Sequence, residues 1–340
     1  MNSKERVQIA LSHKEPDYVP LFEAWIEKEI INQLSGDPYT TRIYLGMDCL
    51  PLGSHPSNTK AYKNGIDEWG RIFKDGQYGG GIVKNYQDLE KYTPARSHAA
   101  DWFPKKEIRK VKKTYGENYA LFFAWHDCTL GLSYLSMGME NFFLACYNDI
   151  EFVKAVIERS TLWTQALVEE AVKSEVDFIV LGDDAADNSR PIISLPMFQK
   201  LILPEYKKIT KNCPIPIIWH SDGNIELLLP FIVEAGFSGV HSLEPKAGIN
   251  LQIIKQIYGK NLVLVGNVDT SYILCQENLA LVREEVKRAI NQGGPGGGYL
   301  FSSSNSLFSG HNILAIKEMY RYAQKIGKYP IKNAELETTY

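Results

Sequence analysis

Acidic, imidazole and amide side chains recur in this chain at the ends of short apolar runs. In order along the sequence they are Glu23, His126 with Asp127, Asp183 with Asp184, His220 with Asp222, His241 with Glu244, Asn267 with Asp269, and Ser302 to Asn305. Any one of them could cap a following helix. Their accumulation at one kind of position instead indicates an active site that uses proton transfer, metal binding or both.

The sequence His220-Ser221-Asp222 is the sharpest of these signals. Alternate residues leaving a strand can aim an imidazole and a carboxylate at one point. There they could share a metal, move a proton or bind substrate, or pair only with each other. Glu244 and Asp184 come from neighbouring strands and could complete a site of nitrogen and oxygen ligands. We therefore predict catalytic roles for these four residues, with His220, Asp222 and Glu244 as the candidate metal ligands.

A second set of residues near the strand ends is predicted to bind the substrate. Asp183 and Asp184 would place like charges side by side, which raises a carboxyl pKa unless one of the two faces away. Aromatic side chains at strand ends could line an apolar pocket or belong to the core. The predicted substrate-binding residues are Glu23, Trp25, Trp125, His126, Asp183 and Asn305.

Short apolar runs alternate with longer amphipathic stretches from about residue 119 onward, which is typical of repeated βα units around a parallel sheet. Seven strands are expected, at Val19–Trp25, Tyr119–Asp127, Asp177–Asp184, Pro214–Gly223, Gly239–Pro245, Asn261–Asp269 and Gly296–Asn305. An eighth would be short or would lie between Tyr44 and Ile82. The pattern predicts a (β/α)₈ TIM barrel, in which the strand ends converge on one mouth.

Helices are expected between these strands and after the last of them. They follow Asn148 or Asp149 and span Met197–Thr210, Asn224–Gly236, Leu279–Asn291 and Asn312–Ile326. The glycine run Gly293–Gly298 precedes a strand, so it is interpreted as a turn and not as a phosphate-binding loop. Residues 1–340 are expected to form a single domain with an N-terminal extension and an inserted loop or lid region, residues 44–118, after the first strand.

Composition excludes several classes of function. A formal net charge of -3 without a basic stretch makes nucleic acid an unexpected partner. The charged N-terminal sequence and the lack of an apolar run approaching ~20 residues argue against a secretory signal and a membrane span. Five cysteines without a C-x-x-C pair predict reduced thiols. We expect a cytoplasmic protein.

Several motifs resemble the uroporphyrinogen decarboxylase-like superfamily, which includes the decarboxylase and the cobalamin-dependent methyltransferases. They are KERVQIALSHKEPDYVP near the start, GDD at Gly182–Asp184, HSDGNIELLLPFIVEAG at His220–Gly236, GNVD at Gly266–Asp269 and PGGGYLFSSSN at Pro295–Asn305. The resemblance covers most of the chain and implies the barrel fold already expected.

The sequence is more similar to the methyltransferase branch than to the true decarboxylases. The decarboxylases carry an arginine-rich motif after the first strand, whereas Phe22–Ile30 has no arginine and is acidic. Ser304-Asn305-Ser306 stands where they have a glycine-flanked histidine. Zinc methyltransferases with thiol acceptors show H-x-C and a late cysteine, where this chain has His220-x-Asp222 and Ser303 or Ser304. The superfamily also contains methyltransferases that demethylate ethers or amines, some with oxygen-rich metal sites, and the absence of cysteines at these positions is compatible with them.

The resemblance implies a methyltransferase that moves a methyl group between a small methyl donor or acceptor and a separate corrinoid protein. Zinc would bind at His220 and Asp222, and the partner protein would supply the methylated corrinoid. Two alternatives stay open. One is a decarboxylase of a smaller substrate, in which Asp183 or Asp222 protonates a carbanion. The other is a ligand-binding barrel without catalysis.

Overall fold

Seven parallel strands form the central sheet of the computed structural model, which describes residues 1–53 and 63–331. In spatial order they are β1 (Cys49–Pro51), β5 (Ala120–Trp125), β6 (Phe178–Gly182), β7 (Ile217–His220), β8 (Gly239–His241), β9 (Val263–Val268) and β10 (Tyr299–Ser303). Six of the seven expected strands are confirmed. The additional strand expected between Tyr44 and Ile82 is β1, which has only three residues.

The strand expected at Val19–Trp25 is not formed as a regular strand. Leu21 instead makes an isolated parallel bridge to Phe301 of β10, and its carbonyl accepts a hydrogen bond of 2.8 Å from the amide of Asp48, next to β1. This segment therefore links the two edges of the curled sheet. The pairing is short because Pro20 has no amide hydrogen and because the amide of Leu21 donates to the carboxylate of Asp48.

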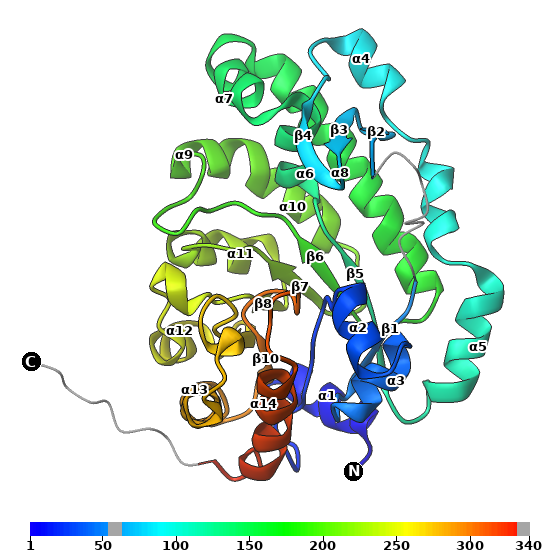
Figure 1. The fold of residues 1–340 in the computed structure, drawn as a ribbon. Coiled ribbons are helices and arrows are strands. Elements are labelled where there is room, and N and C mark those ends of the chain that lie inside the picture. Colours follow the sequence, from blue (N-terminus) through cyan, green and yellow to red (C-terminus); the bar gives the residue numbers. More distant parts are fainter. Residues whose placement is uncertain (54–62, 332–340) are drawn as a thin grey trace, which may run out of the picture.

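Helices surround the sheet (Figure 1). The α-helices are α1 (Ser3–Leu11), α2 (Lys28–Leu34), α3 (Pro38–Tyr44), α4 (Tyr86–Lys91), α5 (Lys105–Tyr115), α6 (Thr129–Met137), α7 (Met139–Asn148), α8 (Ile150–Lys173), α9 (Leu195–Met197), α10 (Leu203–Thr210), α11 (Leu229–Ala235), α12 (Leu251–Tyr258), α13 (Leu279–Gly293) and α14 (Ile313–Ile326). Short 3₁₀ turns are η2 (Arg96–Trp102), η4 (Glu226–Leu228), η5 (Pro245–Ala247) and η6 (Ile273–Cys275), and η3 (Phe198–Ile202) is a π-helical turn. No helix in the described ranges is both long and apolar enough to cross a membrane.

The expected helix boundaries are explained by local chemistry. Asp149 caps α8 by accepting from the amide of Phe152, and Asn312 caps α14 by accepting from the amide of Leu314. Gly236 ends α11 in the left-handed region, with φ of 88°. The helix expected at Met197–Thr210 is interrupted by the η3 turn. Pro204 follows that turn and cannot donate a hydrogen bond to the preceding turn of helix.

The region expected as an inserted loop contains regular structure. It holds an antiparallel ribbon of β2 (Gly65–Ile66), β3 (Arg71–Lys74) and β4 (Gln77–Gly81), followed by α4, η2 and α5, none of which was predicted. The ribbon packs on α6, where the Tyr78 hydroxyl donates to the carbonyl of Leu135 at 2.8 Å. Residues 54–62 of this region lie outside the described residues.

A separate apolar cluster fills the inside of the curled sheet. Phe22 packs against Phe122 and Phe178, with ring centroids 5.0 and 5.6 Å away. Phe178 and Val180 lie two residues apart on β6, so they face the same side of the sheet, and both belong to this cluster. The residues that alternate with them along the strand face the other side and join the core beneath the helices. The inner core thus lies beneath the C-terminal ends of the strands and supports the residues there.

An ion-pair cluster between α13 and α14 predicts a pH-dependent contribution to stability. The hydrogen bonds that Glu318 accepts from Arg321 and Arg283 outweigh its burial and lower the pKa of Glu318 to about 2. Because the pKa is depressed on folding, this stabilisation is present above the unfolded value of 4.5 and is lost as the pH falls toward 2.

Glu318→Gln should therefore lower the free energy of unfolding by about 1–2 kcal/mol at pH 7 and by less at pH 3.5. Urea denaturation at the two pH values measures both differences. Glu284→Gln, on the exposed face of α13, is the matched control and should change neither. An equal loss for Glu318→Gln at both pH values would contradict the assignment.

Candidate active site

Three potential metal ligands from successive strands converge at the C-terminal edge of the sheet. His126 follows β5, Asp184 follows β6 and His220 ends β7. One ligand atom of each lies within 4.8 Å of the others. His220 Nε2 is 3.9 Å from Asp184 Oδ1 and 3.7 Å from Asp222 Oδ1. We call these four residues the strand-end cluster.

His220 is the buried centre of this cluster, with 1% of its surface exposed. Its Nδ1 lies 2.8 Å from Nδ1 of His241, so one of the two rings must carry the shared hydrogen. Its Nε2 has no hydrogen-bond partner among the described residues and is directed at two carboxylates. Burial, with the charges of His241 and His126, holds the pKa of His220 well below its ordinary value. The ring is therefore neutral at pH 7, which is the form that binds metals.

His126 is connected through Asp127 to the inserted ribbon. Its Nδ1 lies 3.1 Å from Asp127 Oδ1, and Arg71 of β3 donates to Asp127 Oδ2 at 2.6 Å and to Asp67 Oδ2 at 2.7 Å. Burial opposes the charge on His126, but the hydrogen bond and charge of Asp127 outweigh it and raise the pKa of His126 to about 9. The Asp67–Arg71 pair lies outside the central sheet and orients His126 through Asp127.

Asp222 lies within a group of polar side chains from three strand ends. Asn305 donates to its Oδ2 at 2.5 Å, and the Ser242 hydroxyl donates to its Oδ1 at 3.3 Å. Burial and the charges of Asp184 and Glu244 raise the pKa of Asp222 to about 7. Glu244 accepts a hydrogen bond of 3.0 Å from the amide of Gly223. Glu244 thus lies beside Asp222 and outside the set formed by His126, Asp184 and His220.

Two other predicted site residues are directed into the protein and away from this cluster. Asp183 is fully buried and accepts hydrogen bonds from the amides of Leu130 and Gly131 and from the Tyr206 hydroxyl. Glu23 is also fully buried and accepts hydrogen bonds from Tyr320 and Ser303. Successive residues of a strand face opposite sides, so Asp184 points toward the cluster and Asp183 points away.

A cavity of about 420 Å³ opens beside the strand-end cluster. Trp25 and Trp125, both expected at the substrate pocket, line it together with His126. The Trp25 ring centroid is 4.8 Å from that of His220 and 5.2 Å from that of His126. Trp102 of η2 also lines the cavity and meets Trp125 edge-on at 4.4 Å.

Several residues of this site were not predicted from the sequence. Arg71, Asp67 and Trp102 lie in the region interpreted as loops, where the only available signal was an oppositely charged pair four residues apart. Gly182 was noted as part of a motif, but its role is spatial. A Cβ added at Gly182 would stand 3.0 Å from the ring of His126, so glycine makes room for that ring.

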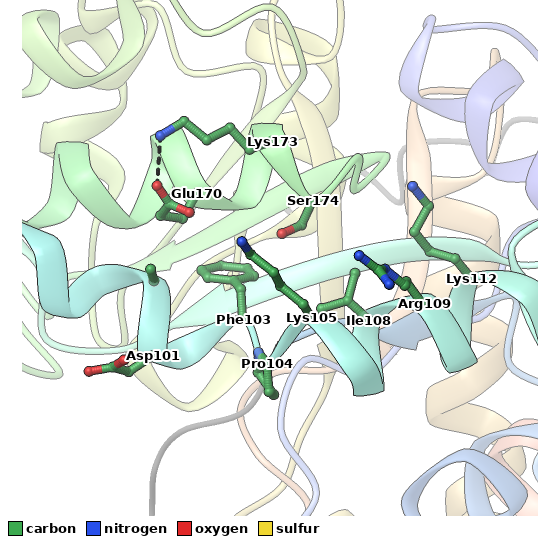
Figure 2. Close-up of a pocket in the computed structure, with 11 residues that line it drawn as sticks. Asp101, Phe103, Pro104, Lys105, Ile108, Arg109, Lys112, Glu170, Lys173 and Ser174 are labelled. Atoms are coloured by element: carbon green, nitrogen blue, oxygen red, sulfur yellow. Dashed lines mark hydrogen bonds and ion pairs between the residues drawn. The ribbon is translucent and has the colours of Figure 1, made fainter.

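A surface groove of about 910 Å³, larger than the cavity beside the strand-end cluster, lies elsewhere, between α8 and the η2–α5 segment. Figure 2 shows Lys105, Arg109 and Lys112 along α5, with Lys173 of α8 paired to Glu170. None of the residues at the strand ends lines this groove. The groove is therefore separate from the strand-end cluster, despite its larger volume.

The side chains of the strand-end cluster fit a divalent metal such as zinc. Zinc in proteins is bound by imidazole nitrogen and carboxylate oxygen, and both types converge here; a bound metal would displace the proton that the raised pKa of His126 favours. The buried Nε2 of His220 lacks a partner among the described residues, and an unsatisfied buried nitrogen of this kind is costly unless something binds it. Cys128, the nearest cysteine along the chain, is buried and its pKa is raised well above the ordinary value, chiefly by that burial.

Two solved structures of known proteins share this fold. A methyltransferase from Methanosarcina mazei superposes with a TM-score of 0.77 at 16% identity and covers 96% of this chain and 99% of that one. A B12-independent methionine synthase from Shewanella gives a TM-score of 0.51 at 10% identity and covers 92% of this chain and 95% of that one. At these identities the likeness concerns the fold.

The family is shown by sequence. Residues 83–326 match the uroporphyrinogen decarboxylase (URO-D) family model, and the chain belongs to this family. Its curated relatives include a methylated-thiol–coenzyme M methyltransferase of Methanosarcina mazei, 23% identical over 46% of this chain and 41% of that protein. A methylcobamide:CoM methyltransferase of Methanosarcina barkeri is 26% identical over 42% of this chain and 44% of that protein. The chain spans less than half the length of these relatives in the matched regions.

Proposed function

We propose that this protein is a methyltransferase that moves a methyl group between a small methylated substrate and a corrinoid protein. The observation that carries the proposal is the strand-end cluster, where a buried imidazole nitrogen and two carboxylates meet beside a cavity, and that nitrogen has no hydrogen-bond partner in the described part of the chain. The relatives that are methyltransferases support the reaction class.

The proposed ligand set differs from the one expected from sequence. His126, Asp184 and His220 would hold the metal, with Asp222 beside them, because their ligand atoms are the ones that converge. Glu244 would instead act on Asp222 through its charge and through the amide of Gly223. When bound, the metal would supply a Lewis acid for the heteroatom that carries the methyl group.

The protein's own groups position the substrate and manage the proton. The methyl–heteroatom bond breaks as the methyl group passes to the corrinoid cobalt, and the heteroatom then requires a proton. Asp222 holds its carboxyl against Asn305 and can carry a proton near neutral pH. It could donate that proton to the leaving heteroatom. Trp25 packs on both imidazoles and would help to exclude water from the buried ring of His220.

Access to the site is compatible with a partner protein. The side chains of His126 and Asp222 are 40% and 32% exposed, so the reacting groups can be reached from the surface.

We further propose that the bridged segment at Leu21 completes an eight-stranded barrel, that the chain is one domain, and that the inserted ribbon acts as a lid. Cytoplasmic location and the absence of a nucleic-acid partner stay predictions.

The test combines metal analysis with a transfer assay. The protein is purified without chelators, its metal content is measured by mass spectrometry, and it is mixed with a reduced corrinoid protein and methylated substrates. We expect near-stoichiometric zinc and the absorbance change of methyl-corrinoid formation. A folded, metal-free protein that transfers no methyl group would reject the proposal and direct attention to decarboxylation or to ligand binding.

A further inference from the structure

His220 and His241 form a buried pair of imidazoles at the strand ends. They end the adjacent strands β7 and β8 and are partners in the register of those strands. Their ring planes differ by 31°, their centroids are 4.8 Å apart, and their two Nδ1 atoms face each other at 2.8 Å. Both side chains are buried. The contact between the rings is therefore held in place by the pairing of the strands that carry them.

A single hydrogen lies between the two Nδ1 atoms. At 2.8 Å one nitrogen must donate and the other must accept, because two lone pairs would repel each other and two hydrogens would collide. Burial lowers the pKa of both rings, so each is neutral at pH 7 and carries a hydrogen on one nitrogen only. The two tautomers are therefore linked. If His220 has its hydrogen on Nδ1, His241 has its own on Nε2, and the reverse arrangement places a hydrogen on Nε2 of His220.

The second nitrogen of His220 is the one that faces the strand-end cluster. Its Nε2 lies 3.7 Å from Asp222 Oδ1 and 3.9 Å from Asp184 Oδ1, and both distances are too long for hydrogen bonds. A metal can bind at Nε2 only through the lone pair, which requires the ring to carry its hydrogen on Nδ1. His241 Nδ1 is the atom placed to accept that hydrogen.

His126, the other imidazole of the cluster, is oriented by a different kind of partner. Its Nδ1 faces the carboxylate of Asp127 at 3.1 Å, and an ionised carboxylate can only accept a hydrogen bond. Asp127 therefore keeps a hydrogen on Nδ1 of His126 and leaves Nε2 for a metal. His241 can donate as well as accept, so the hydrogen of His220 depends on the tautomer of His241.

We propose that His241 is a positioning residue that sets the tautomer of His220 for metal binding. The inference rests on the proposed function, because it concerns the metal that the strand-end cluster would hold. With His241 as the acceptor, the lone pair of His220 Nε2 is directed toward the two carboxylates. Without that acceptor, a hydrogen on Nδ1 would be buried without a partner, and the ring would favour the tautomer that carries it on Nε2. That tautomer cannot bind a metal at Nε2.

Zinc affinity of the full chain, measured by competition with a chromophoric chelator, tests the role of the acceptor. His241→Phe keeps a flat ring but removes the acceptor, and it should bind zinc about 10- to 100-fold more weakly than the wild-type protein. His241→Asn restores an acceptor oxygen and should recover part of that loss. His311→Phe is the matched control, because His311 is also buried but contacts the carbonyl of Thr270, and its zinc affinity should be unchanged.

The hydrogen between the rings can also be observed in the wild-type protein, so the test does not depend on how well a variant folds. In heteronuclear NMR, an N–H···N hydrogen bond gives a through-bond coupling between the two nitrogens. We expect this coupling between Nδ1 of His220 and Nδ1 of His241 in the zinc-loaded protein, with the hydrogen attached to His220. No coupling, or a hydrogen attached to Nδ1 of His241, would overturn the inference.

The outcomes separate this inference from the proposed function. Zinc that binds to folded His241→Phe as tightly as to the wild-type protein would overturn the inference and leave the proposed function standing. Equal losses in His241→Phe and His241→Asn would assign the effect to packing and would also overturn it. A wild-type protein that binds no zinc would reject the metal-assisted function and the inference together.

Discussion

His220→Ala should lose its bound metal and transfer methyl groups at least about 100-fold more slowly than the wild-type protein. His220 Nε2 faces Asp184 and Asp222 at 3.9 and 3.7 Å and is the most deeply buried ligand of the strand-end cluster. A Lewis acid contributes several kcal/mol to such reactions, and about 1.36 kcal/mol corresponds to tenfold in rate.

Mass spectrometry of the purified variant measures the metal, and circular dichroism shows whether it folds. His220→Asn serves as a second variant, because an amide can still bond to His241 and preserve the packing better than alanine. Tyr147→Ala, far from the strand ends in sequence and exposed, should keep both metal and activity. Stoichiometric metal retained in a folded His220→Ala protein would exclude His220 as a ligand.

Asp183→Ala should lower the free energy of unfolding by about 3–5 kcal/mol, the largest stability effect that we expect from one substitution. Asp183 replaces the missing cap of α6. Cys128 makes no side-chain capping bond, and the Asp183 carboxylate instead accepts from the amides of Leu130 and Gly131 in the first turn. It also accepts from the Tyr206 hydroxyl at 2.7 Å. Alanine would leave these donors buried without an acceptor.

Urea denaturation followed by circular dichroism measures the effect. Asp183→Asn keeps an acceptor oxygen and should lose less, about 1–2 kcal/mol. Asp187→Ala is a matched control, because that carboxylate also accepts hydrogen bonds from backbone amides but lies in an exposed turn after β6. A loss below about 1 kcal/mol for Asp183→Ala would mean that the network does not stabilise α6 as described.

The central strands could be predicted because their burial leaves a simple pattern in the sequence. In β6 all five residues are buried, so Phe178–Gly182 appears as an unbroken apolar run bounded by charged residues. The polar residues that follow such runs could also be located. Which of two neighbouring residues faces the site could not be predicted. Asp183 and Asp184 are both acidic and differ only in the face of the sheet to which they point, and that face depends on the residue at which the strand begins.

The set of residues that meet in the strand-end cluster depends on how the sheet curves, and no pattern in the sequence predicts that curvature. Asp184 and Glu244 follow strands on either side of β7, and both seemed able to reach His220. In the structure Glu244 accepts from the amide of Gly223, whereas Asp184 and His126 approach His220. Arg71 was missed for a related reason, since its partner Asp127 lies 56 positions further along the chain.

The link between the sheet edges at Leu21 has a consequence for synthesis of the chain on the ribosome. Leu21 is translated early, but its partner Phe301 emerges some 280 residues later, so the ring of strands stays open for nearly the whole of translation. During that time the side of the Leu21 segment that later meets β10 is free, and it could pair with other nascent chains. Yield in cells should therefore be sensitive to chaperone supply in a way that the stability of the finished protein does not reveal.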